Sequence, residues 1–194
     1  ALITMPGASK FYRSSGPLAC LSQHFYLDEE ATLEWLPQDT IIFPGANAAL
    51  RSVFHLHATS TLLAWELYCL GRPVINETFS HGTLENRLEV WVDGEPRLIE
   101  RLHLSGGDLT PVADHPWVGT LLFYPAREAL LDAVRALLAP LENFGGATLT
   151  DDLLSVRFLS HDNLICQRVM RDIWQSLRPL LTPKTACSPR IWQT

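Results

Sequence analysis

The side chains best suited to chemistry in this sequence include a His-Leu-His run. His55 and His57 lie two residues apart, so on a β-strand both imidazoles point to the same face. Two imidazoles are suitable ligands for Ni²⁺ or Zn²⁺. Two histidines on a solvated strand face, opposite Phe54 and Leu56, would give the same pattern. The pair is therefore kept as an alternative metal site.

Two glutamates lie inside apolar segments. Glu66 follows Trp65 and precedes Leu67, and Glu100 lies within residues 98–102. Burying a carboxylate is costly unless it is paired, so an exposed strand face or an ion pair is one interpretation of Glu100. The other is that such carboxylates line a water-filled passage that holds a divalent cation briefly. Transit needs weak, repeated binding, whereas a closed four-ligand site would retain the ion. The lack of a CxxC or His-rich cluster fits such a passage and equally fits no metal role.

The run Ser160-His161-Asp162 contains the residue types of a hydrolase triad. Triad members usually meet in space and not in sequence, and no Gly-x-Ser-x-Gly elbow is present. Ser160 or Asp162 is better explained as the cap of a helix. No phosphate-binding loop or dinucleotide fingerprint is present either, so we expect no enzyme. A hydrolytic enzyme with a His/carboxylate site stays open as an alternative.

Length and composition set further limits. The chain has 194 residues and a net charge of −6, which argues against a nucleic-acid partner. No apolar run approaches the roughly 20 residues that cross a bilayer, so no membrane partner is expected. The four cysteines form no CxxC pair, which favours reduced thiols and a cytoplasmic location over a disulfide framework. Cys69 and Cys166 have apolar neighbours and are expected in the core.

The elements that must position these residues are mostly strands. Alternating or continuous apolar segments predict strands at 23–27, 31–36, 49–57, 61–69, 84–92, 97–104, 118–124, 147–150 and 153–159. Asp93-Gly94 between two of them predicts a tight hairpin turn. Apolar stripes predict two helices, at about 127–138 and 162–180, and the tail from Thr182 is expected to be loosely held. The pattern indicates a mainly β (α+β) chain forming one domain over 1–194.

Three ordered strings add a family resemblance. They are PGASKFYRS at 6–14, LEWLPQD at 33–39 followed by FPGA at 43–46, and AWE at 64–66 followed by LGRP at 70–73. Their order and spacing resemble the urease accessory protein UreD family, also called UreH, and the resemblance runs over the whole chain. It implies a β-helix-like stack of short strands with two α-helices in the C-terminal third. Periodicity alone does not show a β-helix.

The resemblance implies a non-enzymatic scaffold for urease maturation. Such a protein bridges apo-urease and the UreF–UreG complex, so the implied partners are UreF, UreG through UreF, and the urease structural subunits. Ni²⁺ would pass transiently through it, with no tightly bound cofactor. A β-solenoid module that binds carbohydrate is a further alternative, but Trp35, Trp65 and Trp91 lie in separate strands with apolar neighbours.

The resemblance also assigns residues. It places Ser9 near the nickel passage, and we expect Glu66 and Glu100 to line the passage as well. Arg72, between Gly71 and Pro73, is either a strand-end residue with local hydrogen bonds or a partner contact. Chains of this type normally carry further strands ahead of residue 1, including a Gly-Gly-rich stretch that ends in an acidic residue. The sequence is therefore expected to lack an N-terminal segment of the family.

Overall fold

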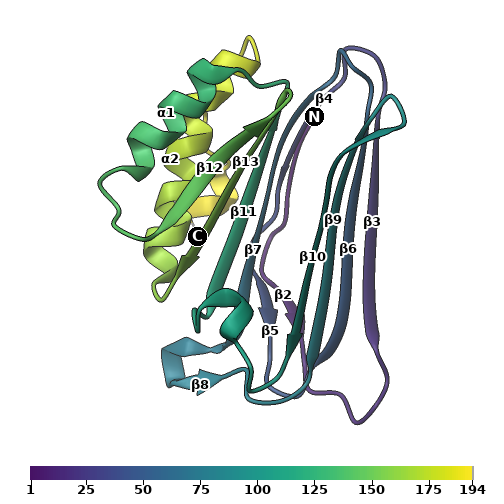
Figure 1. Cartoon of the computed structure of the whole chain (residues 1–194), viewed down its shortest axis with the longest axis vertical. Helices are drawn as coiled ribbons and strands as arrows, with labels where there is room; N and C mark the ends of the chain where they lie inside the picture. The colour runs from purple at the N-terminus through teal and green to yellow at the C-terminus, as the bar shows by residue number, and fades with distance from the viewer. Residues whose placement is uncertain (194) are drawn as a thin grey trace.

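Two β-sheets face each other in the computed structural model, which describes residues 1–193, and two helices cover the far side of the larger sheet (Figure 1). Within these residues, sheet A has nine strands and sheet B has four. Sheet A runs β1 (Leu2–Thr4), β4 (Thr32–Leu36), β7 (Thr61–Arg72), β11 (Trp117–Tyr124), β13 (Leu153–Ser160) and β12 (Gly145–Thr150), with β2 (Ser9–Phe11), β5 (Thr40–Ile42) and β8 (Glu77–Thr78) beside this path. Sheet B runs β10 (Glu95–Ser105), β9 (Thr83–Val92), β6 (Asn47–Leu56) and β3 (Ala19–Leu27).

The strand pairing changes character along the chain. Up to β9 the chain passes back and forth between the sheets, and successive passes pair in parallel: β3 with β6 and β6 with β9, and likewise β1 with β4 and β4 with β7. The hairpin after β9 then returns β10 to the same sheet, and β10, β11, β12 and β13 all pair antiparallel. The architecture is mainly β with two helices. The expected β-helix-like stack is not confirmed for the chain as a whole, because the hairpin ends the parallel winding.

The predicted turn at Asp93-Gly94 is confirmed. Asp93 has φ 48° and Gly94 has φ 83°, and together they join β9 to β10. Two consecutive residues with positive φ are the requirement of a tight hairpin turn, which the Asp-Gly pair meets with little strain. The turn fixes the antiparallel register that places Glu100 opposite Leu88.

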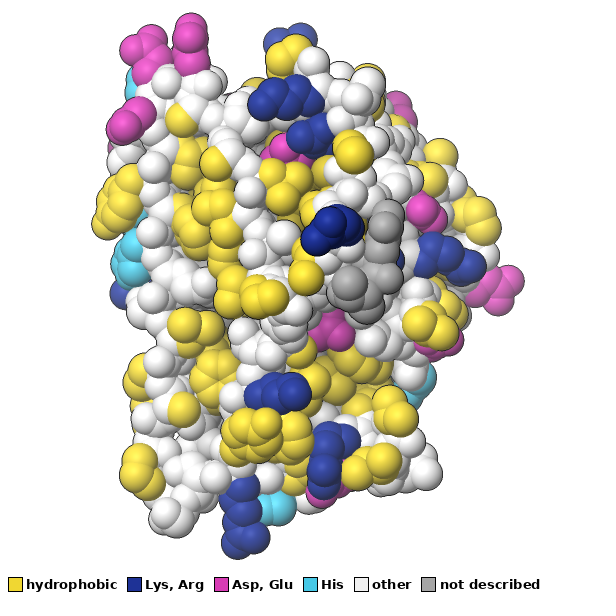
Figure 2. All heavy atoms as spheres, turned by 180° about the vertical axis from the view of Figure 1, so that it is seen from behind, with side chains coloured by type: hydrophobic (Ala, Val, Ile, Leu, Met, Phe, Trp, Pro, Cys, Tyr) yellow, Lys and Arg dark blue, Asp and Glu magenta, His cyan; other side chains and the backbone are white. Residues whose placement is uncertain are grey.

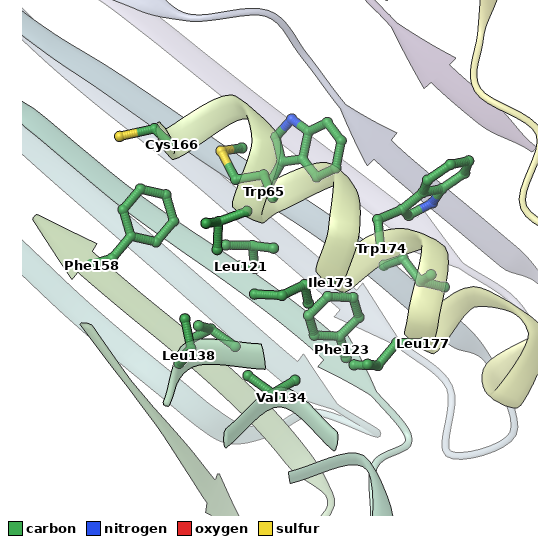
Figure 3. Packing of buried hydrophobic residues seen from close by; sticks show 14 of the residues in the cluster. Trp65, Leu121, Phe123, Val134, Leu138, Phe158, Cys166, Ile173, Trp174 and Leu177 are labelled. Carbon is green, nitrogen blue, oxygen red and sulfur yellow. The ribbon is translucent and has the colours of Figure 1, made fainter. Parts of the chain in front are cut away.

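Helices α1 (Glu128–Leu138) and α2 (Asn163–Leu181) begin and end within one residue of their expected ranges. Their apolar stripes pack on the outer face of sheet A, where Val134, Ile173 and Trp174 are fully buried (Figure 3). Strand β7 lies in the middle of sheet A and is buried on both faces, as its continuous apolar sequence predicts. The helices therefore leave the opposite face of β7 to sheet B.

The expectation of a loosely held tail is wrong at Trp192, although residues 183–191 are exposed or half-buried. Trp192 is buried, and its ring centroid lies 5.3 Å from that of Trp65 and 5.2 Å from that of Trp174. A short 3₁₀ helix, Arg190–Gln193, carries this side chain. The apolar surface that Trp192 covers on α2 and β7 explains why the proline-containing segment folds back.

Candidate functional site

A row of polar side chains crosses the space between the two sheets. Strand register places Glu66, Thr120 and Arg157 at one level of sheet A. It places Gln23, Ser52, Leu88 and Glu100 at one level of sheet B. The two levels meet, because Ser52 bonds to Glu66 and Arg157 bonds to Glu100 from one sheet to the other. We call the six polar members (Gln23, Ser52, Glu66, Glu100, Thr120 and Arg157) the polar row.

The polar row divides the apolar filling between the sheets. One buried cluster on this side of sheet A includes Phe54 and Tyr124, and a second, separate cluster includes Ile42 and Leu84. A continuous hydrophobic core would be the simpler way to join two sheets. The interruption is therefore the feature of this interior that packing alone does not explain.

Glu66 lies at the centre of the row and is buried. The Ser52 hydroxyl donates to its Oε1 at 2.5 Å, and the Tyr68 hydroxyl donates to its Oε2 at 2.7 Å. The Asn86 side-chain amide lies 3.1 Å from the same phenol oxygen. Burial raises the pKa of Glu66 and outweighs these hydrogen bonds, which lower it, and the charge of Glu100 raises it further. The site therefore holds a carboxyl group whose negative charge is poorly compensated.

Glu100 is half-buried at one end of the row and pairs with Arg157. The guanidinium donates through Nε to Oε1 at 2.8 Å and through Nη2 to Oε2 at 2.9 Å, a two-pronged geometry that fixes both groups. The third nitrogen of Arg157, Nη1, donates to the Ser155 hydroxyl at 3.0 Å. The ion pair considered for Glu100 thus exists, with a partner 57 residues away instead of one near Arg101.

Two cavities adjoin the row. A small cavity of about 110 Å³ is lined by Ser9 and Glu66, together with Ser52 and Gln23. A groove of about 750 Å³ is lined by Glu100, Arg157 and Thr120. The structure thus brings Ser9 and Glu66 to one cavity and places Glu100 in the other. The oxygen-rich side chains of the row are the type that hard or borderline divalent cations accept.

The two histidines of the His-Leu-His run are not brought together. His55 stacks on Tyr26 with ring centroids 4.6 Å apart, and His57 lies just beyond the end of β6, where its Nδ1 contacts the Thr59 hydroxyl at 2.9 Å. Across residues 1–193, no three histidine, cysteine, aspartate or glutamate side chains are placed to hold a metal ion. The pair therefore remains an alternative without a third ligand among the described residues.

The Ser160-His161-Asp162 run serves a helix cap. Asp162 is the N-cap of α2, and its Oδ1 accepts hydrogen bonds from the backbone N–H of Leu164 at 2.7 Å and of Ile165 at 3.4 Å. The Ser160 hydroxyl bonds to the backbone of Asp162, and the His161 ring packs against His115. Neither hydroxyl nor carboxylate is aimed at the imidazole, so this run gives the hydrolase alternative no nucleophile and base.

The tryptophans considered for a carbohydrate surface do not form a row. Trp35 and Trp65 are both buried, and they belong to clusters on opposite faces of sheet A. Trp91 lies in sheet B and donates its indole N–H to Glu89 at 3.1 Å. Sugar binding on a strand face needs several aromatic faces side by side, which these three residues do not supply.

Arg72 makes local contacts at the end of β7. It forms an ion pair with Glu77, and its guanidinium lies 5.4 Å from the centre of the Phe43 ring. This is the local hydrogen-bonding interpretation of the residue. Its side chain is 45% exposed, so a partner could still reach it.

The described cysteines are all free, and Cys69 and Cys166 lie in the core as expected. Burial raises the pKa of Cys69 to about 12 and that of Cys166 to about 11, so neither thiol is an activated nucleophile. A search of the described helices finds none with the length and hydrophobicity of a bilayer-crossing segment.

Sequence reasoning missed Arg157 and Ser52, which belong to the polar row, and Tyr68, which donates a hydrogen bond to Glu66. The available signal was local: Arg157 and Ser52 each interrupt an apolar strand segment, and Tyr68 follows Glu66 on the same strand face. What could not be read was the register that brings these strands opposite one another.

Comparison with known proteins gives a consistent family. Residues 1–193 match the model of the UreD urease accessory protein family. The chain is 76% identical over 194 residues to the urease accessory protein UreD of Enterobacter sp. (strain 638), and 70% identical over 193 residues to that of Klebsiella aerogenes. It is 52% identical to a UreD of Pseudomonas putida (strain GB-1) over 194 residues.

These matches cover all of this chain and 70–72% of the length of each of the three relatives. The family model and the identities agree with the resemblance drawn from the three sequence strings. The chain belongs to the UreD family of urease accessory proteins.

Proposed function

We propose that the protein is a non-catalytic scaffold in the cytoplasm that bridges apo-urease and the UreF–UreG complex, and that Ni²⁺ crosses it between the two sheets. Because the chain belongs to a family of urease accessory proteins, the process in which it acts is urease maturation. Ni²⁺ is cargo in this proposal and not a resident cofactor. The residues that contact the ion in turn are Ser9, Glu66 and Glu100, and Arg72 is a candidate contact for a partner.

The observation that carries the proposal is the polar row. It runs through an interior that is otherwise apolar, and it has a cavity beside it at Ser9 and Glu66 and a groove beside it at Glu100. A cation that leaves water needs oxygen ligands along its route and must not be held too strongly at any one of them. Two carboxylates, each already engaged by protein donors, meet both conditions.

Arg157 gives the proposal a specific consequence. The Arg157 guanidinium already forms an ion pair with Glu100, so a cation that binds this carboxylate must compete with it. This ion pair is partly exposed to solvent and therefore weak, so a divalent cation can displace the guanidinium. Glu100 is therefore the position where removal of the carboxylate should lower activation and removal of its partner should not.

The experiment uses the protein at the full length of its relatives, co-expressed with UreF, UreG and urease. Glu100→Ala should leave recovery of the complex intact and lower urease activation by about tenfold or more, the effect of losing a ligand worth about 1.4 kcal/mol to the moving ion. Arg157→Gln should retain activation. Glu95→Ala, which removes an exposed carboxylate from the same strand, is the matched control and should change nothing.

A purely structural ion pair predicts a different pattern. Glu100→Ala and Arg157→Gln would then weaken assembly together, since each leaves the other group unpaired. Full activation with Glu100→Ala in an intact complex would remove Glu100 from the route.

A further inference from the structure

Tyr68 stands where the small cavity and the large groove meet. Among residues 1–193, it is the one residue that lines both. Ser9, Ser52 and Glu66 lie on the side of the small cavity, and Asn86 and Glu100 lie on the side of the groove. Tyr68 is therefore the residue that a route joining the two cavities would meet.

The ring is held in place by its hydroxyl. Tyr68 has a single phenolic proton and donates it to Oε2 of Glu66 at 2.7 Å. Because the other carboxylate oxygen accepts from Ser52 at 2.5 Å, both oxygens of Glu66 are engaged while the ring is in this position. In this position the Tyr68 side chain lies between the two cavities. Its hydroxyl also engages a Glu66 oxygen that a cation would need as a ligand.

A gate at this position requires the Tyr68 side chain to move while its backbone stays in place. Tyr68 belongs to the buried middle of β7, which pairs with β5 on one side and β11 on the other. Its ring borders a groove of about 750 Å³, which is large enough to accept a phenol. Rotation of the side chain toward the groove would release Glu66 and join the two cavities without any change in the sheet.

We propose that Tyr68 is a gate in the nickel route, closed by its hydrogen bond to Glu66 and opened when a cation replaces that bond. The inference rests on the proposed function, since it concerns how the same route is regulated. A cation at Glu66 and the phenol hydroxyl compete for one carboxylate oxygen. Occupancy by the ion therefore favours the open position, and departure of the ion favours the closed one, because a ligand shifts an equilibrium by its differential affinity for the two states.

The test compares three tyrosine variants in the protein at the full length of its relatives, purified in complex with UreF, UreG and apo-urease. Tyr68→Phe retains the ring and removes the hydroxyl. Tyr124→Phe is the matched control: Tyr124 is also buried, faces the same side of sheet A, and donates to the Ala58 carbonyl at 3.1 Å, but it lines neither cavity. Tyr68→Ala removes the ring altogether.

The measurement is the initial rate at which ⁶³Ni added to the complex appears in urease. Tyr68→Phe should raise this rate by about three- to tenfold, the factor expected when one ordinary hydrogen bond no longer opposes opening. Tyr124→Phe should match the unmodified protein. Tyr68→Ala should be at least as fast as Tyr68→Phe if the complex is recovered. Should Tyr68→Phe not assemble, Asn86→Ala removes the second acceptor of the phenolic proton and leaves Glu66 as its acceptor. Transfer should then be slower, and a faster rate would overturn the gate.

A Glu100→Ala arm separates the gate from the route itself. Loss of transfer in Glu100→Ala with an unchanged rate in Tyr68→Phe would overturn the gate and leave the proposed function in place. A slower rate in Tyr68→Phe would show that the hydroxyl assists the ion, which also overturns the gate. Normal transfer in Glu100→Ala would count against the proposed function, and the gate would fall with it.

Discussion

A buried ion pair between β4 and α2 gives the sharpest prediction about stability. Arg178 donates to Glu34 through Nε and Nη2, both at 2.8 Å, and Trp174 donates its indole N–H to the same carboxylate at 2.9 Å. The exposed fraction of the side chain is 10% for Arg178 and 4% for Glu34. Arg178→Met removes the positive charge and leaves the carboxylate in the interior with the indole as its remaining donor.

The magnitude follows from burial. Breaking a buried pair by removing one partner costs about 3–5 kcal/mol, because the remaining charge is uncompensated. For a chain of this length, each kcal/mol lowers the melting temperature by about 2–4 °C, which gives a decrease of about 6–20 °C. Hydrogen bonds from Arg178 raise its own pKa, so the guanidinium stays charged throughout the accessible pH range.

Pulse proteolysis across a urea gradient measures the unfolded fraction at low protein concentration. The double variant Glu34→Leu/Arg178→Met should recover part of the loss, since it buries no lone charge. Glu77→Gln at the exposed Arg72 pair is the control and should leave the midpoint unchanged. The reasoning would be refuted if Arg178→Met behaved like the control, or if the double variant lost the sum of both single effects.

Two further predictions concern the hairpin and the polar row. Gly94→Val should cost about 1–2 kcal/mol in urea unfolding, because Gly94 has φ 83° and no neighbouring atom would touch an added Cβ, so backbone strain is the sole penalty; an unchanged midpoint would contradict the turn. Glu66→Gln should gain stability relative to the unmodified chain as pH rises from 4.5, the ordinary pKa of a glutamate, into the neutral range. Burial raises the folded-state pKa of Glu66 above the unfolded value, so its contribution is complete below the unfolded pKa and is lost as pH rises through the folded one. A variant-minus-parent difference that is the same at both pH values would show that Glu66 does not carry this dependence.

The sequence predicted well those features whose signal is local. The Asp-Gly turn and the apolar stripes of both helices each lie within one short segment, and the structure has them where they were expected. The burial of β7 on both faces was likewise visible in its unbroken apolar run. These features depend on residues a few positions apart, so one sequence contains the information.

The partners of the functional side chains were not visible in the same way. Arg157 reaches Glu100 over 57 positions, and Arg178 reaches Glu34 over 144. Each contact depends on strand order and on strand register. A register shift of one residue would turn the strand's side chains to the opposite face of the sheet. The tail shows the same limit, because Trp192 is buried by surface that α2 and β7 supply, and nothing in its own segment indicates that.

The polar row has an energetic cost that falls on Glu66. Glu66 is buried against hydroxyl donors and has no cation among its hydrogen-bonding partners, whereas Glu34 is buried against Arg178. Both carboxylates lie in sheet A at similarly low exposure, yet one is neutralised by the protein and the other is not. If Glu66 served only to hold the sheets together, an apolar residue would join the two clusters beside it at lower cost. A carboxylate left without a protein cation, with a cavity at its side, is the arrangement expected where the cation comes from outside the chain.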